Sequence, residues 1–106
     1  GKTIPTYTGS GTTTISGTLP TIYFDTDQSV VKETYYGDLA GLAKMMKADA
    51  NMKIVCTGYA DERGSDSYNM SLGNKRAQAV KDFLVKYYGI DASRIDTASK
   101  GEGNPL

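Results

Sequence analysis

The sequence contains no histidine and no tryptophan, and it has a single cysteine among its 106 residues. Without histidine, the chain lacks the commonest general base and the commonest metal ligand of proteins. One cysteine excludes an internal disulfide and any metal site that needs several thiolates. Because Cys56 stands within an apolar run, we expect its thiol to be buried and inert. These absences make an enzyme the least supported class of function.

The sequence also has no excess of charge and no long apolar segment. Twelve Lys and Arg balance twelve Asp and Glu, so the formal net charge is zero, whereas general binding of nucleic acid or of an anionic membrane usually needs a basic surface. No apolar run approaches the roughly 18 residues that cross a bilayer. The chain is 39% apolar and 23% charged, which is typical of one soluble globular domain.

The composition changes at Pro20 and divides the chain into two parts. Residues 1–19 are rich in Thr, Gly and Ser and show no helical period, so we expect a linker or an extended arm. Residues 20–106 alternate between strand-like and helix-like segments, which predicts one domain with the architecture of a two-layer α/β sandwich.

Apolar periodicity predicts where the helices and strands lie. Strands are expected over 21–24, 52–58 and 96–100, and the second of these should bury one face, formed by Met52, Ile54 and Cys56. The first helix ends within 49–51, and its apolar stripe is Tyr35, Leu39, Leu42 and Met46. The second helix runs from a cap at Ser65 or Ser67 to Gly89, and its buried stripe is Leu72, Ala79 or Val80, Phe83, Leu84 and Tyr87.

A carboxylate and a guanidinium are predicted to border one cleft. Asp61 follows the second strand, at the carboxyl end where the binding groups of α/β folds collect. Asn69, Leu72 and Arg76 are spaced i, i+3 and i+7, so they share one face of the next helix. Asp61 could hold an ammonium while Arg76 holds a carboxylate, which suits a zwitterionic ligand. The spacing is also compatible with an Asp61–Arg76 ion pair, or with both side chains facing solvent.

Other candidate motifs favour structural roles. Asp25 and Asp27 begin like a calcium loop, but the Gly and Glu that such a loop requires do not follow, so turn and helix capping is the better account. Serine hydrolysis is not expected, because no histidine is present to activate a serine. Tyrosines at the helix ends are expected to pack on the core with their hydroxyls in water, with a sugar-binding strip as the alternative: Tyr35, Tyr36, Tyr87 and Tyr88.

Residues 58–80, GYADERGSDSYNMSLGNKRAQAV, closely resemble the signature of OmpA-like peptidoglycan-binding domains. The DERG and YN-x-x-LG-x-x-RA segments are most similar to the peptidoglycan-associated lipoprotein branch of that family. Supporting matches occur at 22–25, at 89–90 with 94–95, and at 99–102 with Pro105. The resemblance covers about residues 20–106.

The resemblance implies non-covalent binding of the diaminopimelate residue of a peptidoglycan stem peptide, with no catalysis, cofactor or metal. Asp61 would contact the ammonium of the ligand and Arg76 its carboxylate. Leu72 would contact the aliphatic chain of the ligand, and Asn69 would fix the loop or a backbone group. The full set of positions that match the family's pocket is Phe24, Asp25, Ala60, Asp61, Asn69, Leu72 and Arg76.

The resemblance also implies a place in the cell envelope. The domain would lie in the periplasm, associated with the outer membrane of a Gram-negative-type bacterium, and would reach that membrane only through an anchor or a fused segment. Peptidoglycan is the implied partner and nucleic acid is not. The alternative function is a protein-interaction adapter that docks a Tol-type envelope protein through the same fold.

The chain departs from the family pattern in two places. Family members usually continue past this point through a basic segment into a final strand, so we expect a C-terminally shortened domain over 20–106. Its sheet would then lack the final strand, or be completed by the amino-terminal arm or by another chain. Tyr59 stands where His or another residue is often found, which bears on fine specificity.

Overall fold

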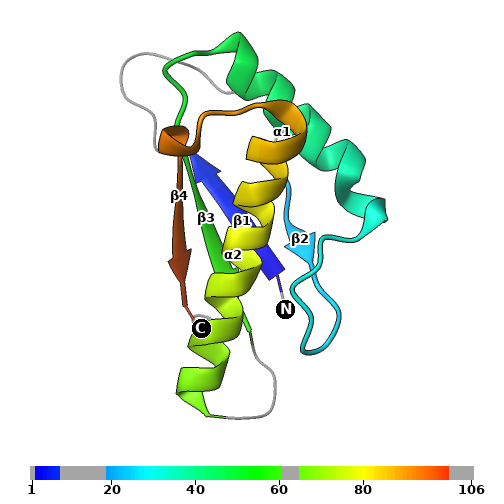
Figure 1. Ribbon diagram of the computed structural model, residues 1–106, viewed down its shortest axis with the longest axis vertical. Helices are drawn as coiled ribbons and strands as arrows, with labels where there is room; N and C mark the ends of the chain where they lie inside the picture. The colour runs from blue at the N-terminus through cyan, green and yellow to red at the C-terminus, as the bar shows by residue number, and fades with distance from the viewer. Residues whose placement is uncertain (1, 8–18, 61–64, 101–106) are drawn as a thin grey trace.

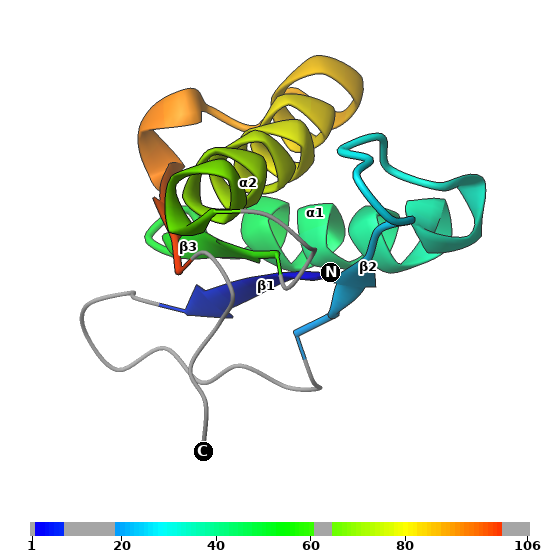
Figure 2. The ribbon, with the colours of Figure 1, turned by 90° about the horizontal axis from the view of Figure 1, so that it is seen from below.

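The computed structural model describes residues 2–7, 19–60 and 65–100. Four strands form one sheet in the order β2-β1-β3-β4, and α1 and α2 lie on the same side of it (Figures 1 and 2). This arrangement confirms the predicted two-layer α/β sandwich. The elements, in chain order, are β1 (Lys2–Tyr7), β2 (Ile22–Tyr23), the 3-10 turn η1 (Glu33–Tyr35), α1 (Tyr36–Ala48), β3 (Ile54–Tyr59), α2 (Asp66–Tyr88), the 3-10 turn η2 (Ala92–Arg94) and β4 (Ile95–Ser99).

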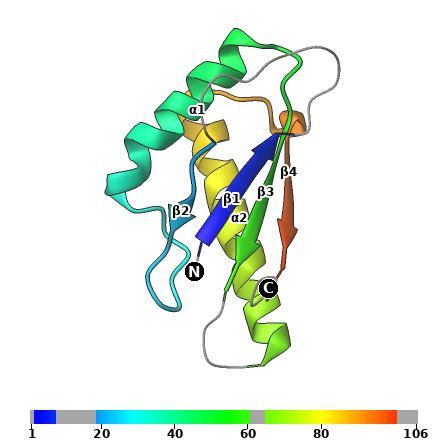
Figure 3. The same ribbon diagram turned by 180° about the vertical axis from the view of Figure 1, so that it is seen from behind.

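Strand β1 lies inside the sheet, although it comes from the segment that we expected to be a linker or an extended arm. It pairs antiparallel with β3 over six residues, from Lys2↔Tyr59 to Tyr7↔Ile54, and antiparallel with β2 at two positions. Seen from behind, β1 and β3 run side by side in front of α2 (Figure 3). In the described residues, the amino-terminal arm therefore supplies a strand of the sheet, which was one of the alternatives raised by the sequence.

The core fills the space between the sheet and the two helices. On β3 the alternation is as predicted, because Ile54 and Cys56 are fully buried while Val55 and Thr57 are half-buried. The helices bury most of the expected stripes, whereas Tyr35, which lies in η1, and Phe83 are half-buried. The buried members are Leu39, Leu42 and Met46 from α1 and Leu72, Val80 and Leu84 from α2. Tyr87 was wrongly assigned to the buried stripe. It is 63% exposed, and its ring packs on Phe83 with ring centroids 4.8 Å apart.

The ends of α2 follow the predicted caps. The side-chain oxygen of Ser65 accepts a hydrogen bond of 3.1 Å from the Tyr68 N–H, which satisfies one of the free donors of the first turn. Gly89 ends the helix in the left-handed conformation, with φ 68°. Strand β3 starts two residues later than predicted, because the Met52 N–H donates to the Asp49 carbonyl in a turn.

Candidate functional site

The candidate site lies where β3 ends and α2 begins, in the lower half of Figure 1. The turn of residues 25–28, which follows β2 and contains a hydrogen bond of 2.9 Å from the Gln28 N–H to the Asp25 carbonyl, borders the same region. Three segments far apart in the sequence therefore meet there. They are the turn 25–28, the end of β3 at Tyr59 and Ala60, and the first three turns of α2.

Two glycines bring α2 against the end of β3. A Cβ atom added to Gly58 would overlap the carbonyl oxygen of Gly73 and lie 2.6 Å from its carbonyl carbon. A Cβ atom added to Gly73 would lie 2.8 Å from the Gly58 oxygen. The Ser99 hydroxyl donates to the Met70 carbonyl at 2.7 Å and ties β4 to the same stretch of helix. Only glycine permits this close approach of helix to strand.

Arg76 occupies the centre of the site and is completely buried. Its Nε donates to the Gln28 carbonyl at 2.8 Å, and its two Nη atoms donate to the carbonyls of Tyr59 and Asp25 at 3.0 Å each. The guanidinium carbon also stands 5.4 Å from the centre of the Phe24 ring, within the range of a cation–π contact. Arg76 therefore joins the turn 25–28 to the end of β3.

The other predicted residues that the structure describes surround Arg76. Asn69, Leu72 and Arg76 are all buried, which confirms that they share the inward face of α2. Phe24 and Ala60 are buried at the ends of the two strands that Arg76 links. Asp61 lies outside the described residues, so the predicted Asp61–Arg76 clamp stays a prediction.

Asp25 takes part through its backbone rather than through its carboxylate. The carbonyl oxygen of Asp25 accepts from Arg76, while its carboxylate pairs with the Lys32 ammonium at 3.0 Å. That ion pair is exposed, 67% for the Asp25 side chain and 44% for that of Lys32, and exposed pairs of this kind contribute at most about 1 kcal/mol. The Asp25 carboxylate therefore faces the solvent side of the site.

The sequence did not point to the contact between Tyr68 and Asp27. The Tyr68 hydroxyl donates to a carboxylate oxygen of Asp27 at 2.8 Å, across 41 residues of sequence. Asp27 has a backbone φ of 60°, a conformation that Asp tolerates better than most residues. An Asp in a short polar turn is a signal for such a conformation, but nothing in the sequence indicates its partner.

The described residues contain no group of metal ligands, no reactive thiol and no membrane-spanning helix. Within residues 2–7, 19–60 and 65–100, no three His, Cys, Asp or Glu side chains are grouped to hold a metal ion. Burial raises the pKa of the Cys56 thiol to about 12, so the thiol stays protonated and weakly nucleophilic near neutral pH. None of the helices in these ranges is long and apolar enough to cross a membrane.

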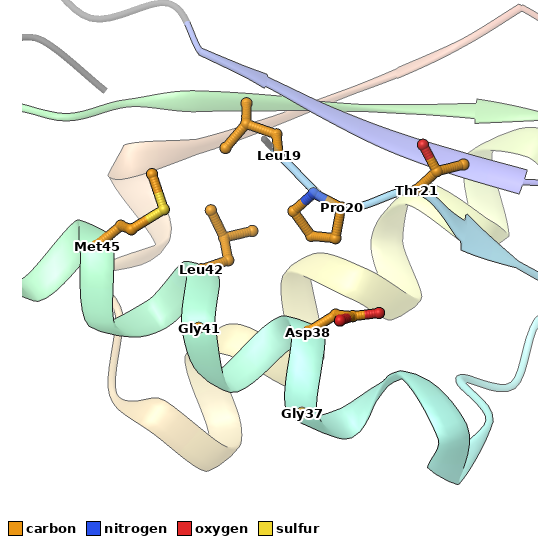
Figure 4. A pocket seen from close by; sticks show the side chains of 8 residues that line it. All are labelled: Leu19, Pro20, Thr21, Gly37, Asp38, Gly41, Leu42 and Met45. Atoms are coloured by element: carbon orange, nitrogen blue, oxygen red, sulfur yellow. The ribbon is translucent and has the colours of Figure 1, made fainter. Parts of the chain in front are cut away.

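A separate cleft of about 500 Å³ opens between α1 and the residues that precede β2 (Figure 4). Among the described residues that line it, Asp38 is the one charged side chain, and none of the predicted site residues in the described ranges takes part. The cleft is therefore distinct from the site around Arg76. Its lining consists of Leu19, Pro20, Thr21, Gly37, Asp38, Gly41, Leu42 and Met45.

Most of the chain is similar in sequence to known proteins. Residues 23–106 match the model of the OmpA family. The chain is 39% identical over 85 residues to outer membrane porin F of Pseudomonas aeruginosa, covering 80% of this chain and 24% of that protein. It is 41% identical over 85 residues to the peptidoglycan-associated lipoprotein of Mesorhizobium japonicum, covering 80% of this chain and 50% of that protein. The chain thus spans half or less of these two relatives.

Solved structures share the fold. The crystal structure of the peptidoglycan-associated lipoprotein from Burkholderia pseudomallei matches with a TM-score of 0.75 and 34% identity, covering 80% of this chain and 71% of that one. The OmpA-like domain of FopA1 from Francisella tularensis matches with a TM-score of 0.72 and 28% identity, covering 80% and 57%.

Proposed function

We propose, from the premise that this chain belongs to the OmpA family, that it is a non-catalytic module that binds the peptide stem of peptidoglycan. The names of its lipoprotein relatives, which are described as peptidoglycan-associated, support this assignment. The observation that carries it is the buried Arg76, which stands in the matched segment between the turn 25–28 and the end of β3.

The ligand group we propose is the diaminopimelate residue, which carries an ammonium and a carboxylate at one end of an aliphatic chain. Arg76 would supply positive charge to the carboxylate in a site where low water content strengthens the attraction. Asp61 would accept hydrogen bonds from the ammonium, and Leu72 and Phe24 would contact the aliphatic carbons. Asn69 and Ala60 would complete the wall, with Asp25 at the rim.

A binding role agrees better than an enzymatic one with the groups that the chain offers. The sequence has no histidine, and the single thiol is buried with its pKa raised to about 12. The chain therefore lacks histidine, the usual general base, and the one thiol, which lies among the described residues, is not an activated nucleophile at neutral pH. In the cell, the module would act in the periplasm and connect the outer membrane, or a complex within it, to the cell wall.

Calorimetric titration with two stem peptides tests the proposal, one peptide containing diaminopimelate and the other lysine at the same position. The lysine peptide lacks the second carboxylate, so we expect it to bind at least about tenfold more weakly, a difference of about 1.4 kcal/mol. Equal binding of both peptides, or binding of neither by a folded protein, would contradict the proposed recognition.

Two protein variants test which side chain contacts each charged group of the ligand. Arg76→Lys keeps the charge but loses the planar fork, and Asp61→Asn removes the partner of the ammonium. Each is expected to weaken binding at least about tenfold, with circular dichroism as the check on folding. Lys75→Ala is the matched control, because Lys75 is the exposed neighbour of Arg76 on α2, and its affinity should equal that of the original protein. Unchanged affinity in both Arg76→Lys and Asp61→Asn would rule out the clamp.

One observation favours protein docking as a second function. Tyr68 and Met70, which are 42% and 45% exposed, are large apolar residues in the first turns of α2, beside the candidate site, and Val30, which is 68% exposed, follows the turn 25–28 in the sequence. Exposed apolar groups that gather in one region are typical of protein-interaction surfaces. A Tol-type envelope protein is the proposed partner, and competition between that partner and a muropeptide would place both functions on the same surface.

A further inference from the structure

The turn 25–28 is attached to α2 at two points. At the inner point, Arg76 donates to the carbonyls of Asp25 and Gln28. At the outer point, the Tyr68 hydroxyl donates to the carboxylate of Asp27 at 2.8 Å. Tyr68 and Arg76 are eight residues apart, which is about 12 Å along a helix. The two contacts therefore attach the turn to well-separated places on α2.

The two attachment points differ in their exposure to water. Arg76 is completely buried, whereas the Tyr68 side chain is 42% exposed. Separating a buried guanidinium from its carbonyl partners leaves several charged and polar groups without hydrogen bonds at once. Such a separation costs much free energy. A phenol–carboxylate hydrogen bond at the surface can exchange with water at little cost. The outer contact is therefore the one that can open while the domain stays folded.

The backbone of the turn supports a specific role for the outer contact. Asp27 is the one non-glycine residue with positive φ in the described parts of the chain, and such strained positions cluster at binding sites. Its partner Tyr68 is fixed in turn, because its N–H donates to the capping oxygen of Ser65. Tyr68 thus links the turn 25–28 to the amino end of α2, two segments that flank the candidate site.

We propose that Tyr68 and Asp27 are positioning residues that hold the turn 25–28 closed against α2 and so set how fast a bound stem peptide is released. The proposal rests on the proposed function for the identity of the ligand, whereas the Tyr68–Asp27 contact is observed independently of that function. The latch is the Tyr68–Asp27 hydrogen bond. Its opening frees the tip of the turn at Thr26 and Asp27, at the edge of the site, while Arg76 keeps its contacts with Asp25 and Gln28. Loss of the latch therefore raises the dissociation rate much more than it changes the association rate.

Tyr68→Phe removes the hydroxyl and keeps the ring. We expect the amide hydrogen of Gln28, which is bonded to the Asp25 carbonyl, to exchange about fivefold faster in this variant, the effect of one modest hydrogen bond. Dissociation of a diaminopimelate stem peptide, followed by surface plasmon resonance, should be about five- to tenfold faster at a nearly unchanged association rate. Tyr87→Phe is the matched control, since Tyr87 is 63% exposed and far along α2, and both rates should equal those of the original protein.

Variants of Asp27 separate the hydrogen bond from the backbone strain. Asp27→Asn keeps an acceptor and a residue that tolerates positive φ, so it should behave like the original protein. Asp27→Gly relieves the strain but removes the acceptor, so it should match Tyr68→Phe. The double variant Tyr68→Phe with Asp27→Gly should be no worse than either single change, because both remove the same contact.

The outcomes distinguish the latch from the proposed function. Unchanged Gln28 exchange and unchanged peptide dissociation in Tyr68→Phe, with the original protein binding the peptide, would overturn the latch alone. The latch would also be overturned if Asp27→Gly kept the original rates of Gln28 exchange and peptide dissociation, or if the effects of the two changes added in the double variant. If the original protein binds no stem peptide, both the proposed function and the role of the latch in release are overturned.

Discussion

Two arginines bind backbone carbonyls at opposite ends of β3. Arg76 donates to backbone carbonyls beside the end of the strand, and Arg94 donates to the carbonyls of Met46, Asp49 and Met52 before its start. A guanidinium presents five donors in a fixed plane, so one side chain can satisfy several carbonyls in loops and at the ends of helices and strands. The loops at both ends of β3 are therefore held by side chains rather than by regular secondary structure.

Cys56 gives the stability of the fold a dependence on pH. Burial raises the pKa of its thiol to about 12, whereas an unfolded chain ionises near the ordinary value of about 8.5. Above that ordinary value the unfolded state loses its proton first, so the folded state holds more protons and its stability falls as pH rises. The free energy of unfolding falls by at most about 1.4 kcal/mol per pH unit for one proton. The stabilisation that the protonated thiol provides is fully present below about pH 8.

Urea unfolding at pH 8, 9 and 10 in the presence of reductant measures this effect. Cys56→Ala is the control, because it lacks the thiol while every other titrating group remains. We expect the original protein to lose stability relative to Cys56→Ala by up to about 1.4 kcal/mol per pH unit above pH 9. Parallel pH profiles for the two proteins would mean that the thiol ionises in the folded chain as easily as in the unfolded one.

At the scale of elements, the contact between α2 and β3 depends on Gly58 and Gly73. The atoms that a Gly58 side chain would meet belong to the backbone of Gly73, so no rotamer change can make room and the helix itself must move. We expect Gly58→Ala to lower the free energy of unfolding by about 3 kcal/mol. Because α2 also carries Arg76, stem-peptide binding should weaken with it.

Gly41→Ala is the matched control for Gly58→Ala. Gly41 lies within α1, and a Cβ atom there would have nothing within 4 Å. Alanine at an open helical position should stabilise the domain by about 0.5–1 kcal/mol. The two substitutions are chemically identical, so opposite signs in chemical denaturation would show that the close approach at Gly58 causes the loss. A small effect at Gly58 would contradict the closeness of helix and strand.

Local signals predicted the elements better than they predicted the site. Ser65 and Gly89 mark the ends of α2 because a cap acts on residues within one turn of it. Arg76 was found through the motif and the spacing, but its carbonyl partners at Asp25, Gln28 and Tyr59 were not. A backbone carbonyl is present at every residue, so the side-chain pattern holds no information about which carbonyls a guanidinium meets. The same holds for Asp27, since its partner is 41 residues away.

At the scale of the whole molecule, the position of β1 is the feature that no local pattern predicts. Its neighbours in the sheet are β2 and β3, and its six pairs with β3 join residues about fifty positions apart. Pro5 argues against an interior strand, because proline cannot donate to a ladder. The structure accommodates it because β2 pairs only with Lys2 and Thr3, so at Pro5 one side of the strand has no paired neighbour in the described sheet.

A disulfide tests both the register and the origin of β1. Pro5 stands directly opposite Cys56, and opposite residues of an antiparallel pair have Cα atoms about 4.5–5.5 Å apart, within the range of a disulfide. We therefore expect Pro5→Cys to form an intramolecular disulfide with Cys56. Oxidation should be carried out during refolding at low protein concentration, because the buried thiol stays protonated once the domain has folded.

Non-reducing electrophoresis and peptide mapping identify the product. A monomer with a 5–56 disulfide means that β1 belongs to the same chain and pairs in the observed register. A disulfide-linked dimer with the same 5–56 connection means instead that the strand comes from a second copy, since a terminal strand can exchange between chains when its neighbours remain in place. Thr3→Cys is the control, because Thr3 is opposite Gly58 and has no sulfur across the strand pair. If Pro5→Cys oxidises no better than Thr3→Cys, then β1 does not lie beside Cys56, and the order of the sheet must be different.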